Sequence, residues 1–318
     1  MEWVRSVVDW ASLRGRSLAR RIVVLAVAFS LPRGLLNRLY LLLTPAQQRY
    51  FYRRFAKIFR ETRVRGSNGT WRVRFNGKSF RMPLTKERFW LDWDSSLSVI
   101  GHEPEIKDTY QAFLKSPEAP ELFVDIGANY GTHSLLFLVH GIETLTFEPN
   151  TSCHGCFREM CHLNHVTPRL EPVALGDREG LVELIYPERE TWLGSINTGV
   201  VGSLVSSQGT VRQPVELKRL DDYLSQIQRK RTLIKIDTEG NELAVLRGAM
   251  KVLREVRPAV VFECMGSGER TEVFAFFDAI HYRIYGLPWN PMRKDGALES
   301  SHFQASPALN FIAVPTTV

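Results

Sequence analysis

The chain has 318 residues, of which 44% are hydrophobic and 24% charged, and a net charge of +7. This is the composition of an ordinary globular protein with one good core and a small extra element. The first 60 residues hold 12 Lys and Arg against Glu2 and Asp9, which leaves 29 basic against 32 acidic residues in the rest. A nucleic-acid enzyme usually carries its basic face on the catalytic body, so we expect no nucleic-acid partner.

Residues 1–60 are predicted to form a basic helical arm. The apolar run at residues 22–31 ends at Pro32 and Arg33, after roughly half of the 20 residues that a membrane span needs. Arginine pairs alternate with Trp, Leu, Tyr and Phe, a composition that suits helices lying on an anionic membrane surface. Peripheral membrane contact and a helical cap packed on the body remain open. The Arg-rich, acid-poor start resembles an organelle transit peptide, but the Tyr- and Phe-rich segment that follows argues against one. No small-residue cleavage site follows the apolar run promptly, which argues against a signal peptide. We expect a cytoplasmic location, with the membrane surface as the alternative.

Residues 61–115 are predicted to form a small β element and a linker. Apolar and polar residues alternate from Thr70 to Pro83 around Asn76-Gly77. Asn-Gly between alternating segments is a strong signal for a β-hairpin.

Four cysteines in a chain of this length do not make a disulfide framework. Cys153, Cys156 and Cys161 cluster among three histidines, which raises the question of zinc. Structural zinc sites pair two ligand clusters across a spacer, and no second cluster follows. We therefore expect core cysteines, no metal and a reducing compartment.

Residues 116–318 are predicted to form the main domain, an α/β fold of the doubly wound, Rossmann-like type. Near-continuous apolar strands alternate with helical segments, which indicates a mostly parallel sheet covered on both faces. The predicted strands are residues 122–127, 144–149, 172–175, 233–237, 259–264, 282–285 and 310–314. The predicted helices are residues 130–139, the segment ending near 163, 241–256 and 271–279.

Notable polar residues stand at the carboxyl ends of these strands, where such sheets bind ligands. The first strand ends in Asp125, followed by Gly127 and Gly131, whose freedom permits a tight turn close to a ligand. A carboxylate here opposes phosphate and suits a cation such as the amino group of S-adenosylmethionine. Glu148 ends the next strand, where a carboxylate can bind both ribose hydroxyls.

The later strand ends continue this pattern. Ala174 and Leu175 are placed to flank an adenine. Asp237 and Glu263 close apolar strands, where burying a carboxylate without a role is costly. Glu239 and Glu242 stand in the first turn of a helix, where an acidic residue is often only a favourable dipole partner.

In these residues the chain resembles the FkbM-type methyltransferases. The resemblance runs from Gly101 to Glu263, and the arm before residue 60 has no counterpart in it. It is carried in order by Gly101-His102-Glu103-Pro104-Glu105, Asp125–Gly131, Glu148-Pro149, Asn164, Ala174–Asp177, Asn197-Thr198-Gly199, Leu220-Asp221-Asp222, Ile234–Gly240, Arg247-Gly248-Ala249 and Phe262-Glu263.

The resemblance implies a sheet with a reversed last strand and S-adenosylmethionine as methyl donor. It also implies a hydroxyl acceptor on a sugar, glycolipid or polyketide-like natural product. The cofactor-binding residues expected are Glu103, Asp125, Gly127, Ala128, Asn129, Gly131, Glu148, Pro149, Ala174, Leu175 and Asp237.

An alcohol must lose its proton during methyl transfer, so a base is required. The candidates are Asp237 first, then Glu239 and Glu263. His102 and His133 are weaker candidates, because a lone histidine in such a place is more often structural. The Gly- and Ser-rich segment 192–209 is predicted to be a mobile loop over the substrate.

Two other functions stay open. A nicotinamide oxidoreductase would need G-x-G-x-x-G after the first strand, but Asn129 stands at the second glycine. A non-catalytic, membrane-associated scaffold would keep the fold without turnover. The intact acidic set at Asp125, Glu148 and Asp237 argues against loss of cofactor binding.

Overall fold

The structure, a computed structural model, describes residues 16–60, 68–188, 194–196, 209–293 and 295–316. The chain forms two compact units, Met1–Pro104 and Glu105–Val318, which are described separately. The boundaries expected at residues 60 and 115 remain predictions. Most of the predicted loop at residues 192–209 lies outside the described residues.

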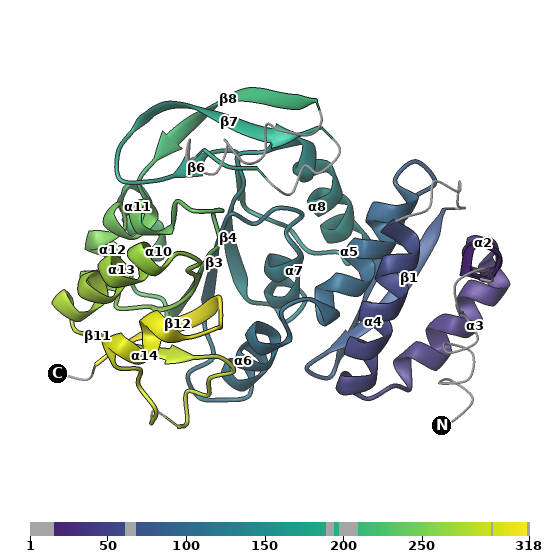
Figure 1. The fold of residues 1–318 in the computed structure, drawn as a ribbon, viewed down its shortest axis with the longest axis horizontal. Coiled ribbons are helices and arrows are strands. Elements are labelled where there is room, and N and C mark those ends of the chain that lie inside the picture. Colours follow the sequence, from purple (N-terminus) through teal and green to yellow (C-terminus); the bar gives the residue numbers. More distant parts are fainter. Residues whose placement is uncertain (1–15, 61–67, 189–193, 197–208, 294, 317–318) are drawn as a thin grey trace. The chain divides into compact units, whose positions relative to one another are not determined.

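The described residues of the first unit form four helices and one hairpin (Figure 1). Its helices are α2 (Arg16–Ala28), α3 (Ser30–Leu41), α4 (Pro45–Arg60) and α5 (Phe89–Gly101), and its strands are β1 (Gly69–Phe75) and β2 (Lys78–Leu84). The predicted hairpin is confirmed: the strands pair antiparallel around Asn76 and Gly77, which have φ of 43° and 82°. Positive φ at both turn residues is what a type I′ turn requires. Stacked aromatic rings fill this unit, with Trp71 and Trp93 fully buried.

Among the described residues, no single helix is long and apolar enough to cross a membrane. The segments Arg20–Ala28 and Ser30–Leu41 reach that length and composition only together, and they meet at an angle of 102°.

The second unit is built on a seven-stranded sheet in the order β11-β12-β10-β9-β3-β4-β5. Its strands are β3 (Leu122–Ile126), β4 (Glu143–Phe147), β5 (Leu170–Glu171), β9 (Thr232–Ile236), β10 (Ala259–Glu263), β11 (Tyr282–Gly286) and β12 (Asn310–Pro315). Only β12 runs antiparallel to its neighbours. The predicted doubly wound sheet with a reversed last strand is confirmed.

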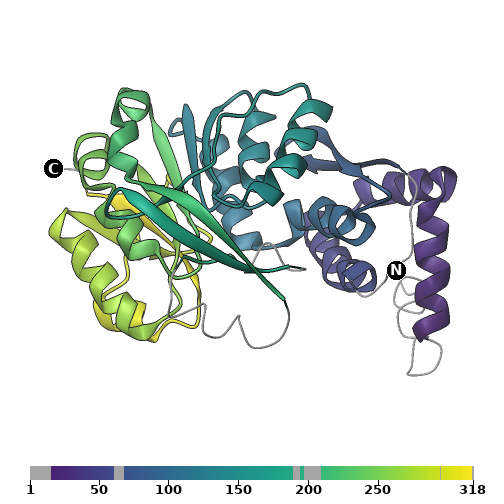
Figure 2. The same cartoon turned by 90° about the horizontal axis from the view of Figure 1, so that it is seen from above.

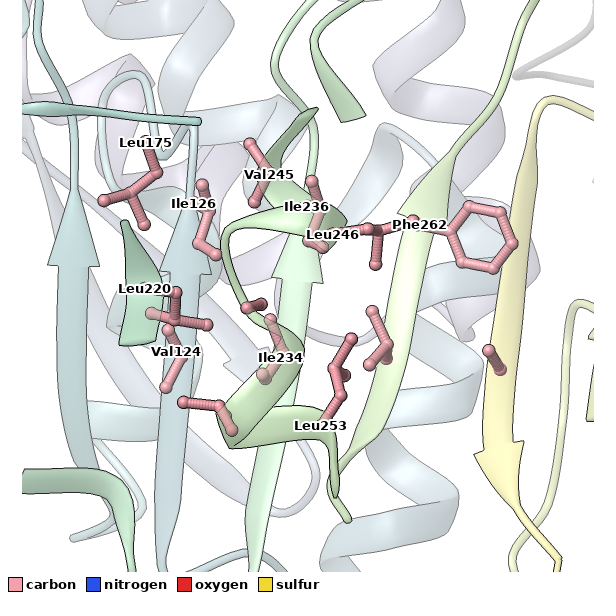
Figure 3. Close-up of a cluster of buried hydrophobic side chains, with 14 of the residues drawn as sticks. Val124, Ile126, Leu175, Leu220, Ile234, Ile236, Val245, Leu246, Leu253 and Phe262 are labelled. Atoms are coloured by element: carbon pink, nitrogen blue, oxygen red, sulfur yellow. The ribbon is translucent and has the colours of Figure 1, made fainter. Parts of the chain in front are cut away.

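Helices cover both faces of this sheet. They are α6 (Pro104–Leu114), α7 (Thr132–Leu138), α8 (Thr151–Leu163), α10 (Leu224–Ile227), α11 (Glu242–Arg247), α12 (Met250–Glu255), α13 (Ser267–Ala279) and α14 (Ser300–Ala305). On one face, Ile234, Ile236 and Phe262 pack against Leu246 and Leu253 of α11 and α12 (Figure 3). The other face is aromatic against α6 and α7, where the ring of Phe123 stacks on that of Phe137.

The clustered cysteines 153, 156 and 161 are buried on α8, and none of the four cysteines, all within the described residues, is in a disulfide. The described residues contain no group of three or more His, Cys, Asp and Glu placed to hold a metal ion.

Two predicted elements differ from the structure. The third strand, expected at residues 172–175, is β5 at Leu170–Glu171. The chain then leaves the sheet at Pro172, which has no N–H to donate, and β6 (Ala174–Leu175) pairs with β8 (Thr210–Lys218). Together with β7 (Gly180–Pro187) these strands form a separate three-stranded sheet, whose long ribbon is visible in Figures 1 and 2. The sequence patterns had not predicted that ribbon.

The single helix expected at residues 241–256 is broken into α11 and α12. A Cβ on Gly248 would lie 1.9 Å from the carbonyl oxygen of Gly176, so the chain passes very close to its neighbour there. The carboxylate of Asp221 accepts hydrogen bonds from the backbone N–H groups of Lys251 and Val252. This side chain therefore caps a new helix start.

Candidate functional site

An open cavity of about 700 Å³, counting the solvent in its mouth, lies at the carboxyl ends of the central strands. Its described lining comes from the ends of β3, β4, β6 and β9, with further residues from β7 and the segment after it. The lining residues are Ile126, Gly127, Asn129, Phe147, Glu148, Pro149, Asn150, Val173, Ala174, Leu175, Leu184, Gly194, Ile196, Asp237, Thr238, Glu239 and Asn241.

The turn after β3 forms one wall of the cavity. The N–H groups of Gly127 and Ala128 both donate to the carbonyl oxygen of Phe147, at 3.0 and 3.1 Å. Gly127 has a φ of 75°, and a Cβ there would lie 1.7 Å from the carbonyl oxygen of Asp237. Glycine is therefore required by the neighbouring strand end as well as by the backbone angle.

Glu148 lies in the cavity wall with both carboxylate oxygens held by backbone. Its Oε2 accepts from the N–H of Asn129 at 2.7 Å and its Oε1 from the N–H of Asn150 at 2.7 Å. Burial raises the pKa of Glu148 to about 7, although these two hydrogen bonds oppose the shift. Each oxygen keeps a second lone pair, so the carboxylate can still accept from two hydroxyl groups of a ligand.

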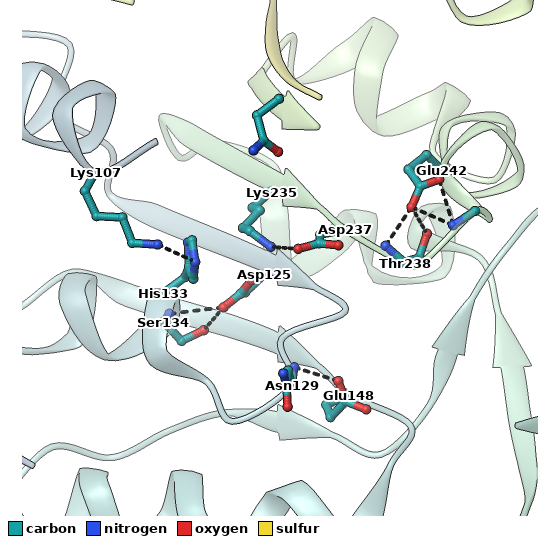
Figure 4. A network of polar contacts seen from close by, with 12 residues as sticks. Lys107, Asp125, Asn129, His133, Ser134, Glu148, Lys235, Asp237, Thr238 and Glu242 are labelled. Atoms are coloured by element: carbon teal, nitrogen blue, oxygen red, sulfur yellow. Dashed lines mark hydrogen bonds and ion pairs between the residues drawn. The ribbon is translucent and has the colours of Figure 1, made fainter. Parts of the chain in front are cut away.

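Asp125 lies below the cavity and does not line it. Its Oδ2 accepts from both the N–H and the hydroxyl of Ser134, at 3.0 and 2.7 Å (Figure 4). The side chain is fully buried, and burial raises its pKa while the charge of Lys235 lowers it. Asp125 therefore braces the start of α7 behind the glycine turn. Direct contact between Asp125 and a cofactor remains a prediction.

Lys235 and Asp237 form an ion pair at the end of β9. The ammonium of Lys235, whose side chain is 4% exposed, donates to Oδ2 of Asp237 at 2.8 Å. Asp237 is 28% exposed and lines the cavity. A buried cation thus holds a carboxylate that solvent or a ligand can reach.

Glu263 ends the neighbouring strand β10 and does not line the cavity. Burial raises its pKa to about 9, with further contributions from the charges of Asp237, Glu239 and Glu242. At neutral pH this carboxyl is protonated, so it is a hydrogen-bond donor and a poor proton acceptor.

His133 is buried in a polar cluster between α6 and α7. Its Nε2 is 2.9 Å from Nζ of Lys107, and its Nδ1 is 3.0 Å from the hydroxyl of Tyr110. Both ring nitrogens are thus engaged within the fold, as expected for a structural histidine. His102 belongs to the first unit, where its ring contacts Tyr52.

The segment after β9 is shaped by Glu242. Its carboxylate accepts from the N–H and hydroxyl of Thr238 and from the N–H of Gly240, so it closes the loop as a cap (Figure 4). This loop carries Glu239, which has a φ of 53° and accepts from the hydroxyl of Ser195 through its carbonyl oxygen.

Eight of the predicted site residues line the cavity: Gly127, Asn129, Glu148, Pro149, Ala174, Leu175, Asp237 and Glu239. Asp125, Ala128, Gly131 and Glu263 belong to the same unit but not to the described lining. Glu103 lies in the first unit, with a φ of 43°, and its contact with a cofactor stays a prediction.

Nine lining residues were not among the predicted site residues, and four of them show why. Asn150 and Asn241 follow predicted strands directly, and the amide of Asn241 donates to the carbonyl oxygen of Leu175. A search for polar residues just after each strand would have found them. Leu184 and Ile196 come from β7 and the segment after it, which no strand-end rule covers.

The described lining of the cavity is acidic. It carries three carboxylates, Glu148, Asp237 and Glu239, and no lysine or arginine. Phosphate groups would be repelled here. A cation with ribose hydroxyls and a flat apolar ring would find acceptors at Glu148 and apolar walls at Phe147, Val173 and Leu175.

The family model for the FkbM methyltransferase domain matches residues 125–284, about half of the chain. No curated protein matches. Among solved structures, the FkbM methyltransferase of Methylobacillus flagellatus aligns at 15% identity and a TM-score of 0.37, over 70% of this chain and 54% of that one. The ribosomal protein L11 methylase of Lactobacillus delbrueckii subsp. bulgaricus aligns at 10% identity and a TM-score of 0.37, over 68% and 81%.

The chain thus spans about half of the Methylobacillus protein. The matched segment begins at Asp125, so it contains the glycine turn and the acidic strand ends at Glu148 and Asp237. The chain belongs to the FkbM family of S-adenosylmethionine-dependent methyltransferases.

Proposed function

We propose that this protein transfers a methyl group to a hydroxyl oxygen of a sugar, a glycolipid or a polyketide-like natural product. The observation that carries the proposal is the Lys235–Asp237 pair, which places an ion-paired carboxylate in the wall of the cavity. An alcohol, unlike an amine or a sulfide, needs such a proton acceptor during methyl transfer.

The cavity fits the cofactor of the family. In this proposal Glu148 binds the ribose hydroxyls, and the apolar wall at Phe147, Val173 and Leu175 holds the adenine. The backbone of the glycine turn after β3 lies against the amino-acid part of S-adenosylmethionine. The absence of cationic side chains in the described lining argues against the pyrophosphate of a nicotinamide dinucleotide.

S-adenosylmethionine, when bound, supplies an electrophilic methyl group on a sulfonium. Transfer of this methyl group to the acceptor oxygen would break the carbon–sulfur bond and leave its electron pair on sulfur. Asp237 accepts the hydroxyl proton on Oδ1, while Lys235 holds Oδ2 and keeps the carboxylate in position. Glu239, in the same wall, orients the acceptor hydroxyl group. Positioning and exclusion of water supply the rest.

The compartment is proposed to be the reducing cytoplasm, since four buried thiols without a disulfide are stable there. The acceptor is proposed to be a small molecule or glycan, not a nucleic acid, because the basic residues lie outside the second unit's cavity.

The first experiment is calorimetric titration of the full chain with S-adenosylhomocysteine and, separately, NADH. We expect saturable binding of the first only, weakened by Glu148→Ala and retained by Asp237→Asn. NADH binding, or no binding by folded protein, would contradict the cofactor assignment.

Turnover is then measured with methyl-labelled S-adenosylmethionine against panels of sugars, glycolipids and polyketide-like alcohols. Asp237→Asn is expected to lower kcat by about 100-fold or more, with Asp278→Asn, an exposed aspartate on α13, as the matched control. Label on nitrogen or sulfur in the product would refute a hydroxyl acceptor. Cofactor binding with no product from any panel would favour the scaffold function.

A further inference from the structure

Helix α3 of the first unit buries three side chains that carry polar groups and exposes leucines along its length and at its end. Arg33, Asn37 and Tyr40 are buried, whereas Leu31, Leu35, Leu39 and Leu42 are exposed to 86, 61, 53 and 81%. A surface helix in water normally has the opposite arrangement.

Specific contacts fix this orientation of α3. The amide of Asn37 donates to the carbonyl oxygen of Arg72 in β1 at 2.8 Å, and the N–H of Arg72 donates back to Asn37 Oδ1 at 2.8 Å. Arg33 donates to the carbonyl oxygen of Asn68 at 3.2 Å and lies so close to Gly69 that a Cβ there would be 2.2 Å from the guanidinium. Turning the leucines inward would break these bonds, so their exposure is built into the unit.

Further exposed apolar side chains lie on α2 and just after it. Ile22 and Leu25 of α2 are exposed to 57 and 50%, and Phe29, between α2 and α3, to 66%, while Val24 and Val27 of α2 are buried. We call this surface the apolar arm face; it consists of Ile22, Leu25, Phe29, Leu31, Leu35, Leu39 and Leu42. These seven are most of the large apolar side chains exposed among the described residues.

Charge identifies the partner. From residue 10 to residue 60 the sequence has no Asp or Glu, whereas residues 16–60 contain ten Lys and Arg. Of these, Arg21, Arg38, Arg53 and Arg54 are exposed. A second copy of the chain would bring like charges together, and a nucleic acid would leave the leucines in water. Anionic lipid accommodates both, with acyl chains for the leucines and headgroups for the arginines.

We propose that the apolar arm face docks the protein on the surface of an anionic lipid bilayer. The leucines and Phe29 enter the boundary between headgroups and acyl chains, and the arginines contact lipid phosphates. Each helix keeps its other face packed within the unit, through Val24 and Val27 in α2 and Tyr40 in α3, so the helices lie along the surface.

The test is sedimentation of the full chain with phosphatidylcholine vesicles, with and without phosphatidylserine. Wild type is expected to pellet with the anionic vesicles and to be released as salt rises. The variant Leu31→Ser/Leu35→Ser/Leu39→Ser is expected to lower the partition coefficient at least about tenfold. The matched control is Leu181→Ser/Met292→Ser/Leu309→Ser, which removes exposed apolar side chains of the second unit and is expected to pellet like wild type.

Unchanged circular dichroism and S-adenosylhomocysteine binding would show that both variants are folded. Equal pelleting of both variants, or no pelleting of wild type, would overturn the proposal. So would a dimer that the arm variant abolishes, or tighter binding to a DNA duplex than to vesicles.

Discussion

At the scale of single residues, Glu148 combines a binding role with a titration near neutral pH. Burial raises its pKa to about 7, and only the ionised form accepts from two ribose hydroxyls while keeping both backbone bonds. We predict that affinity for S-adenosylhomocysteine rises about tenfold between pH 6 and pH 8. Glu148→Gln should bind more weakly and lose this pH dependence, as measured by calorimetry across the range.

The control for Glu148 is Glu143→Gln, which changes an exposed glutamate at the start of the same strand. It should retain the wild-type profile. An unchanged profile in Glu148→Gln would assign the titration to another group and remove Glu148 from the ribose site.

Lys235 is expected to be essential for the stability of the second unit. Its charge lowers the pKa of the buried Asp125 and its ammonium pairs with Asp237, so Lys235→Met leaves both carboxylates without their cation. We predict a loss of about 3 kcal/mol in the free energy of unfolding at pH 8. A further rise in the folded-state pKa of a carboxyl group lowers the free energy of unfolding only at pH values where that group is ionised in the wild type. The loss caused by Lys235→Met should therefore be smaller at pH 5 than at pH 8.

Chemical denaturation at the two pH values measures this effect. The matched control, Lys230→Met, breaks an exposed pair with Glu143 and should cost about 0.5 kcal/mol or less. Equal losses in the two variants would show that the Lys235 pair contributes no more than a surface ion pair.

The strand-end rule explains why Glu148 and Asp237 could be placed in the site from sequence. The same rule put Asp125 in the binding set; in the structure its carboxylate accepts from Ser134 of α7, and its contact with a cofactor stays a prediction. The side of the sheet toward which a strand-end side chain points depends on the strand register and on the helix packed against that side. A short sequence motif contains neither piece of information.

At the scale of elements, the turn after β3 allows a sharp comparison of two glycines. Gly127 and Gly141 have similar φ values of 75° and 78°, but only Gly127 has a close neighbour, the carbonyl oxygen of Asp237. We predict that Gly141→Ala costs about 1 kcal/mol, from backbone strain alone. Gly127→Ala should cost at least about 3 kcal/mol, because the strand end must also move.

Thermal unfolding followed by circular dichroism measures both variants, and titration with S-adenosylhomocysteine tests the site in whatever folds. Equal costs at the two positions would mean that the neighbouring strand yields easily and that only the backbone angle demands glycine at residue 127.

Local patterns predicted most elements of the second unit and missed those that depend on partners. Strands β3, β4, β9 and β10 are short apolar runs and were correct to within two residues. The break between α11 and α12 comes from a long-range cap by Asp221, and β6 is a strand only because it pairs with β8. Features that depend on residues far apart in the sequence leave no pattern in a short stretch of it.

At the scale of the whole molecule, the order of strands and helices was sufficient to predict the doubly wound sheet, because parallel connections leave few alternatives. The basic arm was predicted as helices, but its inverted α3 was not. The leucine pattern of α3 predicts that the leucines face the core. The hydrogen bond from Asn37 to β1 shows instead that the side of the helix that carries Asn37 is buried.

The raised pKa values of Glu148 and Glu263, about 7 and 9, make the stability of the protein depend on pH. In the unfolded chain both groups ionise near their ordinary value of 4.5. Between pH 4.5 and the raised pKa of each group, the folded protein binds more protons than the unfolded chain. The free energy of unfolding therefore falls as pH rises. The two shifts together set an upper limit of about 8 kcal/mol for the loss from pH 5 to pH 9, and solvent screening at the partly buried Glu263 lowers it. We predict a loss of at least about 3 kcal/mol, or a fall of roughly 6 °C or more in Tm.

Thermal melts across this range test the prediction with two variants and one control. Glu148→Gln should reduce the slope of the curve between pH 5 and pH 7, and Glu263→Gln should reduce it over the whole range from pH 5 to pH 9. Glu299→Gln, just before α14, should follow wild type. A wild-type curve that stays level would show that Glu263 is ionised in the folded protein at neutral pH. Glu263 would then stand beside Asp237 as a candidate base for the acceptor hydroxyl.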